Sequence, residues 1–349
     1  MNLRLLGGLA PRDFLRGHWQ KRPLFVRRAL PGFSGVADER ALRRLARRGD
    51  VESRIVRRRG MKWETEHGPF KSAAISKTNC TILVSGLNLH LPAADALLRR
   101  FAFLPLARLD DVMVSYATPG GGVGPHVDSY DVFLLQGPGR RRWRVRFRGR
   151  LLEYLAGPGD LLYLPPGVEH DGVALDPCYT YSIGFRAPRG AELAAAFLDW
   201  LHERGLPDAA YRDPGLRPAR SPAALPPEML AFARRSLERI SWTDADVADF
   251  LGRHLTEPKA HVVFHPARSR VALANARVRL DPKTQLLYSG RAFFMNGERV
   301  DVPPSARAAL RALADRRSLE GRRLARGPLA GLISGWLRAG YAHLERLQP

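Results

Sequence analysis

The chain has 349 residues, of which 45% are hydrophobic and 26% charged, a composition typical of a globular protein with more than one domain. Cys80 and Cys178 are the only cysteines, which excludes a disulfide framework and a cysteine-based zinc or iron–sulfur site. No apolar run approaches the roughly 20 residues of a membrane span, and the N-terminus does not resemble a signal peptide. We therefore expect a cytoplasmic protein without a membrane partner.

The charge is strongly one-sided, since 56 basic residues stand against 34 acidic ones and the formal net charge is +22. Only six of the basic residues are lysines, which leaves fifty arginines. Such a surface suits phosphate and carboxylate partners, so contact with RNA or a nucleoprotein particle is one interpretation. A bias that replaces lysine by arginine would explain the ratio but not the excess of positive charge.

The N-terminal third mixes helix and strand patterns, with helices expected at 13–19 and 38–48, a hairpin around Gly60 and a strand at 82–89. Residues 110–185 differ, because short alternating strands are separated by glycine and proline turns. The strands are expected at 112–117, 127–136, 143–147, 160–164 and 179–185. This spacing is typical of an all-β sandwich or barrel, with the jelly roll or cupin among the options.

Residues 187–258 have a helical pattern, which a proline-rich stretch at 207–227 interrupts, and we expect this stretch to be a linker between modules. Two amphipathic helices are expected at 228–240 and 243–254. Beyond them, short strands are expected at 277–280, Leu286–Ser289 and Ala292–Met295, followed by helices at 305–315 and 329–338. Asn296-Gly297 is a strong hairpin signal. This pattern predicts a small α+β unit with a β wing.

The pattern His126-Val127-Asp128 opens a strand just after a glycine-rich turn. Residues i and i+2 of a strand project to one face, so the imidazole and the carboxylate converge. His170 follows the strand at 160–164 and a Pro-Pro-Gly turn. Two histidines and one carboxylate form a facial triad that leaves coordination positions of Fe(II) open for a bidentate cosubstrate and dioxygen. The alternative is a surface turn whose histidines do not bind a metal.

The stretch from Arg140 to Arg148 places arginine at every even position and an apolar residue at most odd ones. Arg141 is the exception, because it shares the inner face with Trp143 and Val145. A buried arginine needs an anion, and a 2-oxoglutarate carboxylate would provide one. Otherwise Arg141 lies at the strand edge and its side chain reaches solvent.

Two further side chains are candidates for the same pocket. Ser115 lies on the preceding strand and could offer its hydroxyl to the same carboxylate. Tyr130 has the parity of His126 and Asp128, which predicts a place at the pocket mouth. For both, ordinary packing in a strand is the alternative.

The stretches VSYATPGGGVGPHVDSYDVFLLQGPGRRRWRV, GDLLYLPPGVEHDGVAL and YSIGFRAP resemble the JmjC-type 2-oxoglutarate oxygenases, and among them the bacterial ribosomal oxygenases of the cupin type. FLRGHWQKRPLFVRRAL and WETEHGPF are similar to the same family. The resemblance covers most of residues 10–235 and more loosely the rest. One departure is the segment between Arg148 and Gly157, which is shorter than in well-known members.

The resemblance implies a mixed α+β protein with a double-stranded β-helix (jelly-roll, cupin, JmjC) core and flanking helices. The implied domains are a JmjC oxygenase domain at 1–205, a helical linker and dimerisation region at 206–258, and a winged-helix-like domain at 259–349. The resemblance implies Fe(II) as the metal, with 2-oxoglutarate and O2 as cosubstrates. It also implies that the chain forms a homodimer.

The resemblance also implies roles for individual residues. The iron ligands would be His126, Asp128 and His170, and the residues that bind 2-oxoglutarate would be Arg141 and Ser115. Tyr130 and Ser182 would lie near the substrate, an arginine of a large-subunit ribosomal protein that is hydroxylated at its β-carbon.

Four other functions stay open. The target could be a histidine of a ribosomal protein, as in eukaryotic relatives, or a methylated lysine that is demethylated. The chain could instead be a nucleic-acid-binding regulator that uses its C-terminal domain, or a metal-binding cupin without oxygenase activity.

Overall fold

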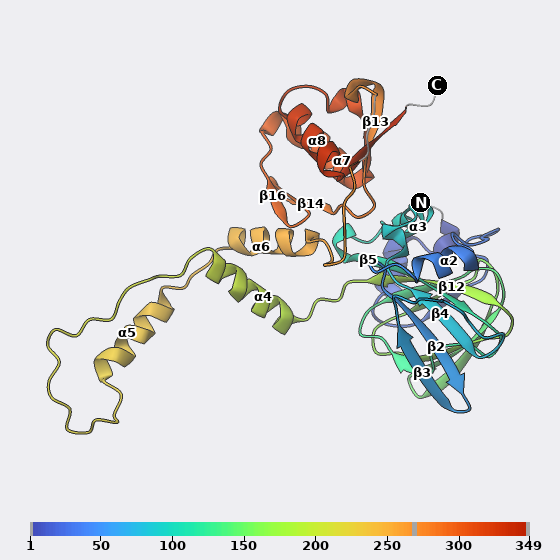
Figure 1. Cartoon of the computed structure of the whole chain (residues 1–349), viewed down its shortest axis with the longest axis horizontal. Coiled ribbons are helices and arrows are strands. Elements are labelled where there is room, and N and C mark those ends of the chain that lie inside the picture. The colour runs from blue at the N-terminus through green and yellow to red at the C-terminus, as the bar shows by residue number, and fades with distance from the viewer. Residues whose placement is uncertain (1–2, 267–270, 347–349) are drawn as a thin grey trace.

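The computed structural model describes residues 3–266 and 271–346. Two antiparallel sheets stack face to face and form a double-stranded β-helix (Figure 1). The larger sheet has the order β1-β10-β7-β12-β5-β4-β2-β3, and the smaller has the order β6-β11-β8-β9. The jelly-roll core expected from the sequence is therefore confirmed.

The strands of the larger sheet are β1 (Leu24–Val26), β2 (Ser53–Arg59), β3 (Lys62–His67), β4 (Cys80–Val84), β5 (Leu109–Ala117), β7 (Val132–Gln136), β10 (Leu161–Leu164) and β12 (Cys178–Phe185). Those of the smaller sheet are β6 (His126–Val127), β8 (Arg141–Phe147), β9 (Arg150–Ala156) and β11 (Glu169–Ala174). Single-turn 3-10 helices lie at Leu3–Leu6, Leu87–Leu89, Leu106–Arg108, Leu273–Asn275, Pro304–Ala306 and Gly321–Arg323.

Two apolar layers cover the faces of the larger sheet. Helices α1 (Pro11–Gly17), α2 (Glu39–Leu45) and α3 (Pro92–Arg99) cover its outer face and bury Phe14 and Leu42 against it. The inner layer lies between the two sheets and contains eight buried residues: Val132, Leu134, Trp143, Val145, Ala156, Leu162, Leu164 and Val168. This inner layer closes one side of the barrel and leaves the rest of its interior to the polar site described below.

The structure differs from the sequence prediction at two strands. The predicted strand 127–136 is interrupted between β6 and β7, because Asp131 turns inward and its carboxylate accepts hydrogen bonds from Tyr163 Oη (2.6 Å) and Gln20 Nε2 (3.0 Å). The predicted strand 82–89 ends at Val84, where Gly86 adopts a φ of +62° and a 3-10 turn follows. The segment between Arg148 and Gly157 forms β9, which pairs with β8 as a hairpin.

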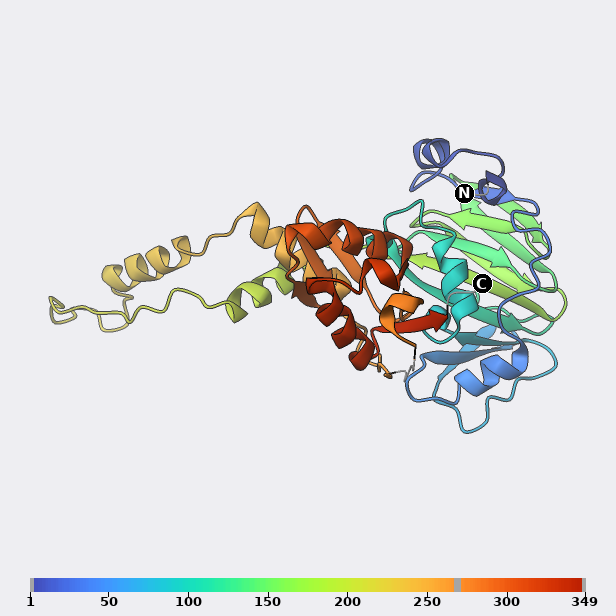
Figure 2. The same cartoon turned by 90° about the horizontal axis from the view of Figure 1, so that it is seen from above.

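Helices α4 (Gly190–Glu203) and α5 (Pro227–Glu238) form an arm that extends away from the barrel (Figures 1 and 2). The proline-rich stretch joins the two helices. No residue of α5 is buried. Helix α5 therefore has little contact with the rest of this chain, whereas Phe197 and Trp200 of α4 pack against the ring of Phe250.

The C-terminal unit combines helices α7 (Arg307–Arg316) and α8 (Pro328–Ala339) with two small sheets. One sheet has the order β17-β13-β18 and the other β14-β15-β16, with strands β13 (Ala276–Leu280), β14 (Leu286–Ser289), β15 (Ala292–Met295), β16 (Glu298–Val300), β17 (Ser318–Glu320) and β18 (Ala342–Arg346). A separate apolar core, with Leu310, Ile333 and Trp336, holds them together. The predicted α+β unit with its hairpin at Asn296-Gly297 is confirmed.

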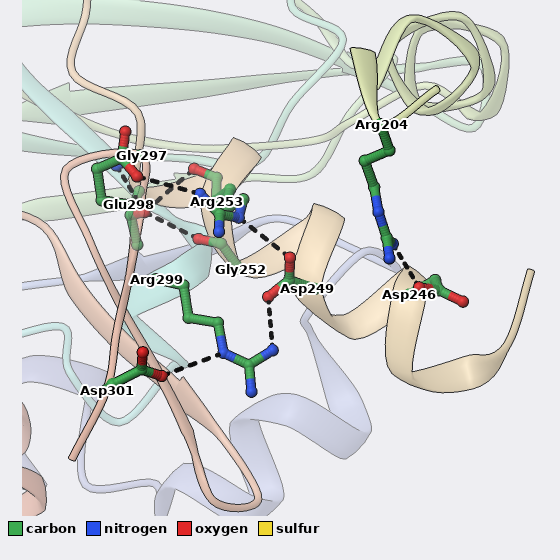
Figure 3. Close-up of polar contacts among 10 residues, drawn as sticks. Arg204, Asp246, Asp249, Gly252, Arg253, Gly297, Glu298, Arg299 and Asp301 are labelled. Atoms are coloured by element: carbon green, nitrogen blue, oxygen red, sulfur yellow. Dashed lines mark hydrogen bonds and ion pairs between the residues drawn. The ribbon is translucent and has the colours of Figure 1, made fainter. Parts of the chain in front are cut away.

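Helix α6 (Asp244–Thr256) is attached to this C-terminal unit (Figure 3). Asp249 forms an ion pair with Arg299 of β16 (3.0 Å), and Arg253 forms one with Glu298 (3.1 Å). Gly252 lies against the Phe294 ring so closely that an added Cβ would be 2.2 Å from it. The resemblance implied that residues 206–258 form a linker and dimerisation region, whereas the side chains of this helix contact the β14–β16 sheet.

Within the residues that the structure describes, no helix combines the length and the apolar character that crossing a bilayer requires.

Candidate active site

His126 and His170 occupy one register position of the smaller sheet, because β6 and β11 pair antiparallel with His170 opposite His126. Their ring centroids lie 4.2 Å apart. Asp128 follows β6 directly, and its Oδ2 lies 3.8 Å from His170 Nε2. One ligand atom of each of the three residues lies within 4.8 Å of the others. They form the only such cluster of histidine, cysteine or acidic side chains found in the described ranges 3–266 and 271–346.

Backbone carbonyls fix both imidazole rings. The Nδ1–H of His126 donates to the Gly124 oxygen (2.9 Å) and that of His170 to the Val168 oxygen (3.0 Å). A carbonyl oxygen only accepts, so each Nε2 keeps its lone pair toward the cluster. Burial lowers the pKa of His170 and favours the neutral ring that binds a metal. The donor set of two neutral imidazoles and one carboxylate fits Fe(II).

Arg141 faces the interior from the first residue of β8, while Arg142 and Arg144 on the same strand are exposed. Its side chain is only 3% exposed, and neither Nε nor one terminal nitrogen has a hydrogen-bond partner. Within the described residues no ion pair to Arg141 is found. Because an unpaired buried guanidinium is costly, the site is suited to an anionic ligand that binds it with both nitrogens.

A pocket of about 510 Å³ connects the His–Asp–His cluster with Arg141. Its walls come from both sheets, with Ser115 on β5 and Ser182 on β12 among the lining residues. Ser115 is buried, and its hydroxyl lies 3.5 Å from the Thr180 carbonyl oxygen. Tyr130 also lines the pocket and is 38% exposed. Burial, and then the Asp128 carboxylate, raise the pKa of Tyr130 to about 12, so its phenol stays protonated.

Carboxylates lie at the mouth of the pocket, together with Arg54 and Lys259. Asp110 and Asp111, at the start of β5, both line it. Asp111 Oδ2 accepts a hydrogen bond from the Gly86 amide (2.8 Å), which orients the carboxylate. Burial, and then the adjacent Asp110, raise the pKa of Asp111, whereas Lys259 opposes that rise. The pocket thus has an arginine and a metal-binding cluster inside and carboxylates at its entrance.

Comparison with known proteins agrees with this geometry. Residues 96–154 and 147–193 match the JmjC domain family, and residues 239–343 match the ROXA-like winged helix. The ribosomal protein uL16 3-hydroxylase of Escherichia coli is 35% identical over 95% of this chain and 97% of its own length. This chain belongs to the bacterial JmjC ribosomal oxygenases.

Solved structures of a ribosomal oxygenase from Escherichia coli superpose on nearly the whole chain. The complex with cobalt and 2-oxoglutarate has a TM-score of 0.83 and 33% identity, and covers 97% of this chain and 98% of its own. The complex with cobalt and succinic acid matches equally well. The expected family and fold, a JmjC core followed by a winged-helix domain, are confirmed for this ribosomal oxygenase.

All the predicted site residues of this ribosomal oxygenase line one pocket: His126, Asp128, His170, Arg141, Ser115, Tyr130 and Ser182. Tyr130 reaches it by a different route from the one expected. The parity argument assumed a continuous strand, but Tyr130 lies in the loop between β6 and β7.

The carboxylates at the pocket mouth of this ribosomal oxygenase were not predicted from the sequence. Asp110 and Asp111 form an Asp-Asp pair before a strand of alternating pattern, and that pair was the available signal. It was not informative alone, because Lys259 and Arg186, which contact Asp110, lie more than 70 residues further along the chain.

Proposed function

We propose that this chain is an Fe(II)- and 2-oxoglutarate-dependent dioxygenase that hydroxylates the β-carbon of an arginine in the large-subunit ribosomal protein uL16. The observation that carries the proposal is one pocket that contains a His–Asp–His cluster and an unpaired buried guanidinium. The name of the Escherichia coli relative, a uL16 3-hydroxylase, supports the target protein and the 3-position.

His126, Asp128 and His170 would hold the iron through two Nε2 atoms and one carboxylate oxygen. When bound, Fe(II) with 2-oxoglutarate activates O2 to oxidise a C–H bond, while 2-oxoglutarate becomes succinate and CO2. Arg141 would bind the distal carboxylate of 2-oxoglutarate through its two unpartnered nitrogens, and the Ser115 hydroxyl would contribute a further hydrogen bond. The protein's contribution is to orient these groups and to exclude water from the inner pocket.

The substrate arginine would enter from the mouth of the pocket. Its guanidinium would pair with Asp111, whose carboxylate is oriented by the Gly86 amide. Tyr130 and Ser182 would contact the aliphatic part and the guanidinium. This arrangement favours an arginine over the histidine of the alternative function, because a carboxylate pairs bidentately with a guanidinium.

The experiment is incubation of the purified chain with Fe(II), 2-oxoglutarate, O2 and a recombinant uL16 protein. We expect succinate in equal amount to a +16 Da product, with the added oxygen on one arginine by fragmentation mass spectrometry. Oxygen on a histidine would instead establish the histidyl hydroxylase, formaldehyde from a methylated substrate would establish a demethylase, and no succinate with any substrate would contradict the oxygenase.

For the division into domains we propose a JmjC domain at 1–205, a dimerisation region at 206–258 and a winged-helix domain at 259–349, with α6 packed on the last of these. A second copy of the chain would cover α5, which exposes Met229, Leu230 and Leu237. Replacing Leu230 and Leu237 by Asp should convert the dimer to a monomer in light scattering; an unchanged mass would contradict this interface.

We also propose that exposed arginines contact ribosomal RNA of an assembling particle, which agrees with a cytoplasmic location. Arg142, Arg148 and Arg150 on the β8–β9 hairpin are exposed, and no carboxylate pairs with them among the described residues. Binding to a ribosomal RNA fragment should weaken steeply with salt, and less steeply after these three are changed to Gln. Equal salt dependence would remove the hairpin from the interface.

A further inference from the structure

The segment that follows α6 contributes one side chain to the active-site pocket. Lys259, three residues beyond the end of α6, lines the pocket together with Asp110 and Asp111. Its Nζ lies 3.2 Å from Asp110 Oδ1, and the side chain is 40% exposed. A lysine from one domain thus forms part of the substrate entrance of another.

A second cation reinforces this contact. Arg186 follows β12, and its Nε lies 3.6 Å from the same Oδ1 of Asp110. One of its terminal nitrogens donates to the Leu255 carbonyl oxygen at the end of α6 (2.6 Å). Arg186 therefore holds the end of α6 beside the pocket and places Lys259 within reach of Asp110.

The two neighbouring carboxylates differ in what compensates their charge. Asp110 has ion pairs with both Lys259 and Arg186. Asp111 accepts the Gly86 amide, and across residues 3–266 and 271–346 no cation forms an ion pair with it. Glu52 and Arg54 also line the pocket, and the negative charge of Glu52 contributes to the raised pKa of Asp111. One carboxylate, Asp111, is left without a cationic partner.

We propose that Lys259 is a specificity-determining residue of the substrate pocket. Because Lys259 pairs with Asp110, Asp111 is the one carboxylate left to pair with the cationic side chain of the substrate. The inference rests on the proposed hydroxylation of a basic protein. Without Lys259, Asp110 would keep only its ion pair with Arg186. Small cations that lack the rest of the substrate would then bind more tightly at the pocket mouth. Lys259 thereby makes recognition depend on contacts beyond the guanidinium.

The test compares the full-length chain with its Lys259→Met, Lys259→Arg and Lys283→Met variants. Lys283 is a matched control, since its Nζ donates to the Val263 carbonyl oxygen of the same segment but does not line the pocket. The probe is Nα-acetyl-arginine amide, titrated by calorimetry into each protein without added metal and used as an inhibitor of uL16 hydroxylation.

We expect Lys259→Met to tighten binding of the probe about two- to fivefold, the range of an exposed ion pair, and to make binding more sensitive to salt. Lys259→Arg and Lys283→Met should match the wild type, and Asp110→Asn added to Lys259→Met should abolish the gain. Unchanged or weaker probe binding by Lys259→Met, or an equal effect of Lys283→Met, would overturn the inference and indicate a structural contact only. Absence of succinate from the wild type would contradict the hydroxylase, whereas the calorimetric comparison still decides the role of Lys259.

Discussion

His126 and His170 face each other across one antiparallel pair of strands, with ring centroids 4.2 Å apart and each Nδ1 bound to a carbonyl two residues before it. The same local arrangement, an imidazole bonded back to residue i−2, therefore occurs twice. It directs both Nε2 atoms to one point and leaves Asp128 to complete the ligand set.

Removal of the carboxylate should abolish metal binding while preserving the fold. Asp128→Ala leaves two neutral imidazoles, which bind Fe(II) much more weakly. We expect loss of cobalt binding in calorimetry and loss of succinate formation, with the circular dichroism spectrum unchanged. Glu169→Gln is the control, because Glu169 adjoins His170 but faces solvent and pairs with Arg146. Cobalt affinity equal to that of the wild type would contradict the ligand assignment.

Arg141 and Arg142 offer a matched pair on one strand, one buried and one exposed. Arg141→Met should raise the KM for 2-oxoglutarate tenfold or more, since a charged hydrogen-bond pair contributes about 1.5–3 kcal/mol. The ligand-free variant should be at least as stable as the wild type, because it no longer buries an unpaired guanidinium. Measurements are cosubstrate titration and the Tm with and without 2-oxoglutarate. Arg142→Met should leave both values unchanged, and an equal response of the two variants would rule out the role of Arg141.

Asp111 should determine how tightly a basic substrate binds. Asp111→Asn removes the carboxylate but keeps the acceptor for the Gly86 amide. By the same range of about 1.5–3 kcal/mol, we expect the KM for uL16 to rise about 10- to 100-fold. Asp176→Asn, at an exposed ion pair with Arg140, serves as the control. A KM within twofold of the wild type would show that the guanidinium binds elsewhere.

The raised pKa of Asp111 predicts that substrate affinity depends on pH. Burial and Asp110 raise the pKa of Asp111 above the usual value of an aspartate. Only the ionised form attracts a guanidinium, so substrate affinity should be full above this pKa and should fall as pH decreases through it. The loss should begin at a higher pH than for an ordinary carboxylate, whose pKa is about 3.9. A KM profile of the wild type and of Asp111→Asn checks this, and the profile of the variant should lack this step.

Alanine substitutions at Gly252 and Gly331 distinguish the effect of close packing on stability from the effect of helix propensity. Gly252→Ala would place a Cβ 2.2 Å from the Phe294 ring and should destabilise the contact between α6 and β15 by about 1–3 kcal/mol. Gly331, in α8, has open space around the same position, so Gly331→Ala should stabilise the chain by up to about 1 kcal/mol. Urea denaturation measures both changes. Equal effects of the two substitutions would contradict the close packing at Gly252.

Local sequence patterns were sufficient to predict much of the fold and of the candidate site. The period-2 strands between 110 and 185, the His126-Val127-Asp128 spacing and the inward parity of Arg141 could be read from the sequence, because side chains alternate along a strand. Asn296-Gly297 predicted its hairpin for a similar reason, since both residues adopt the positive φ that the turn requires. These features depend on neighbours within a few residues.

Tertiary structure alone decided the rest. Strand 127–136 is broken because buried Asp131 bonds to Tyr163 and Gln20, which are distant in the sequence. The charge at the pocket mouth depends on Arg186, just after β12, and on Lys259, beyond α6, because both form ion pairs with Asp110. The large positive charge of the composition is likewise uninformative about individual residues, since burial distinguishes Arg141 from exposed arginines beside it. Side-chain period follows from local backbone geometry, whereas charge compensation depends on which distant segments come together.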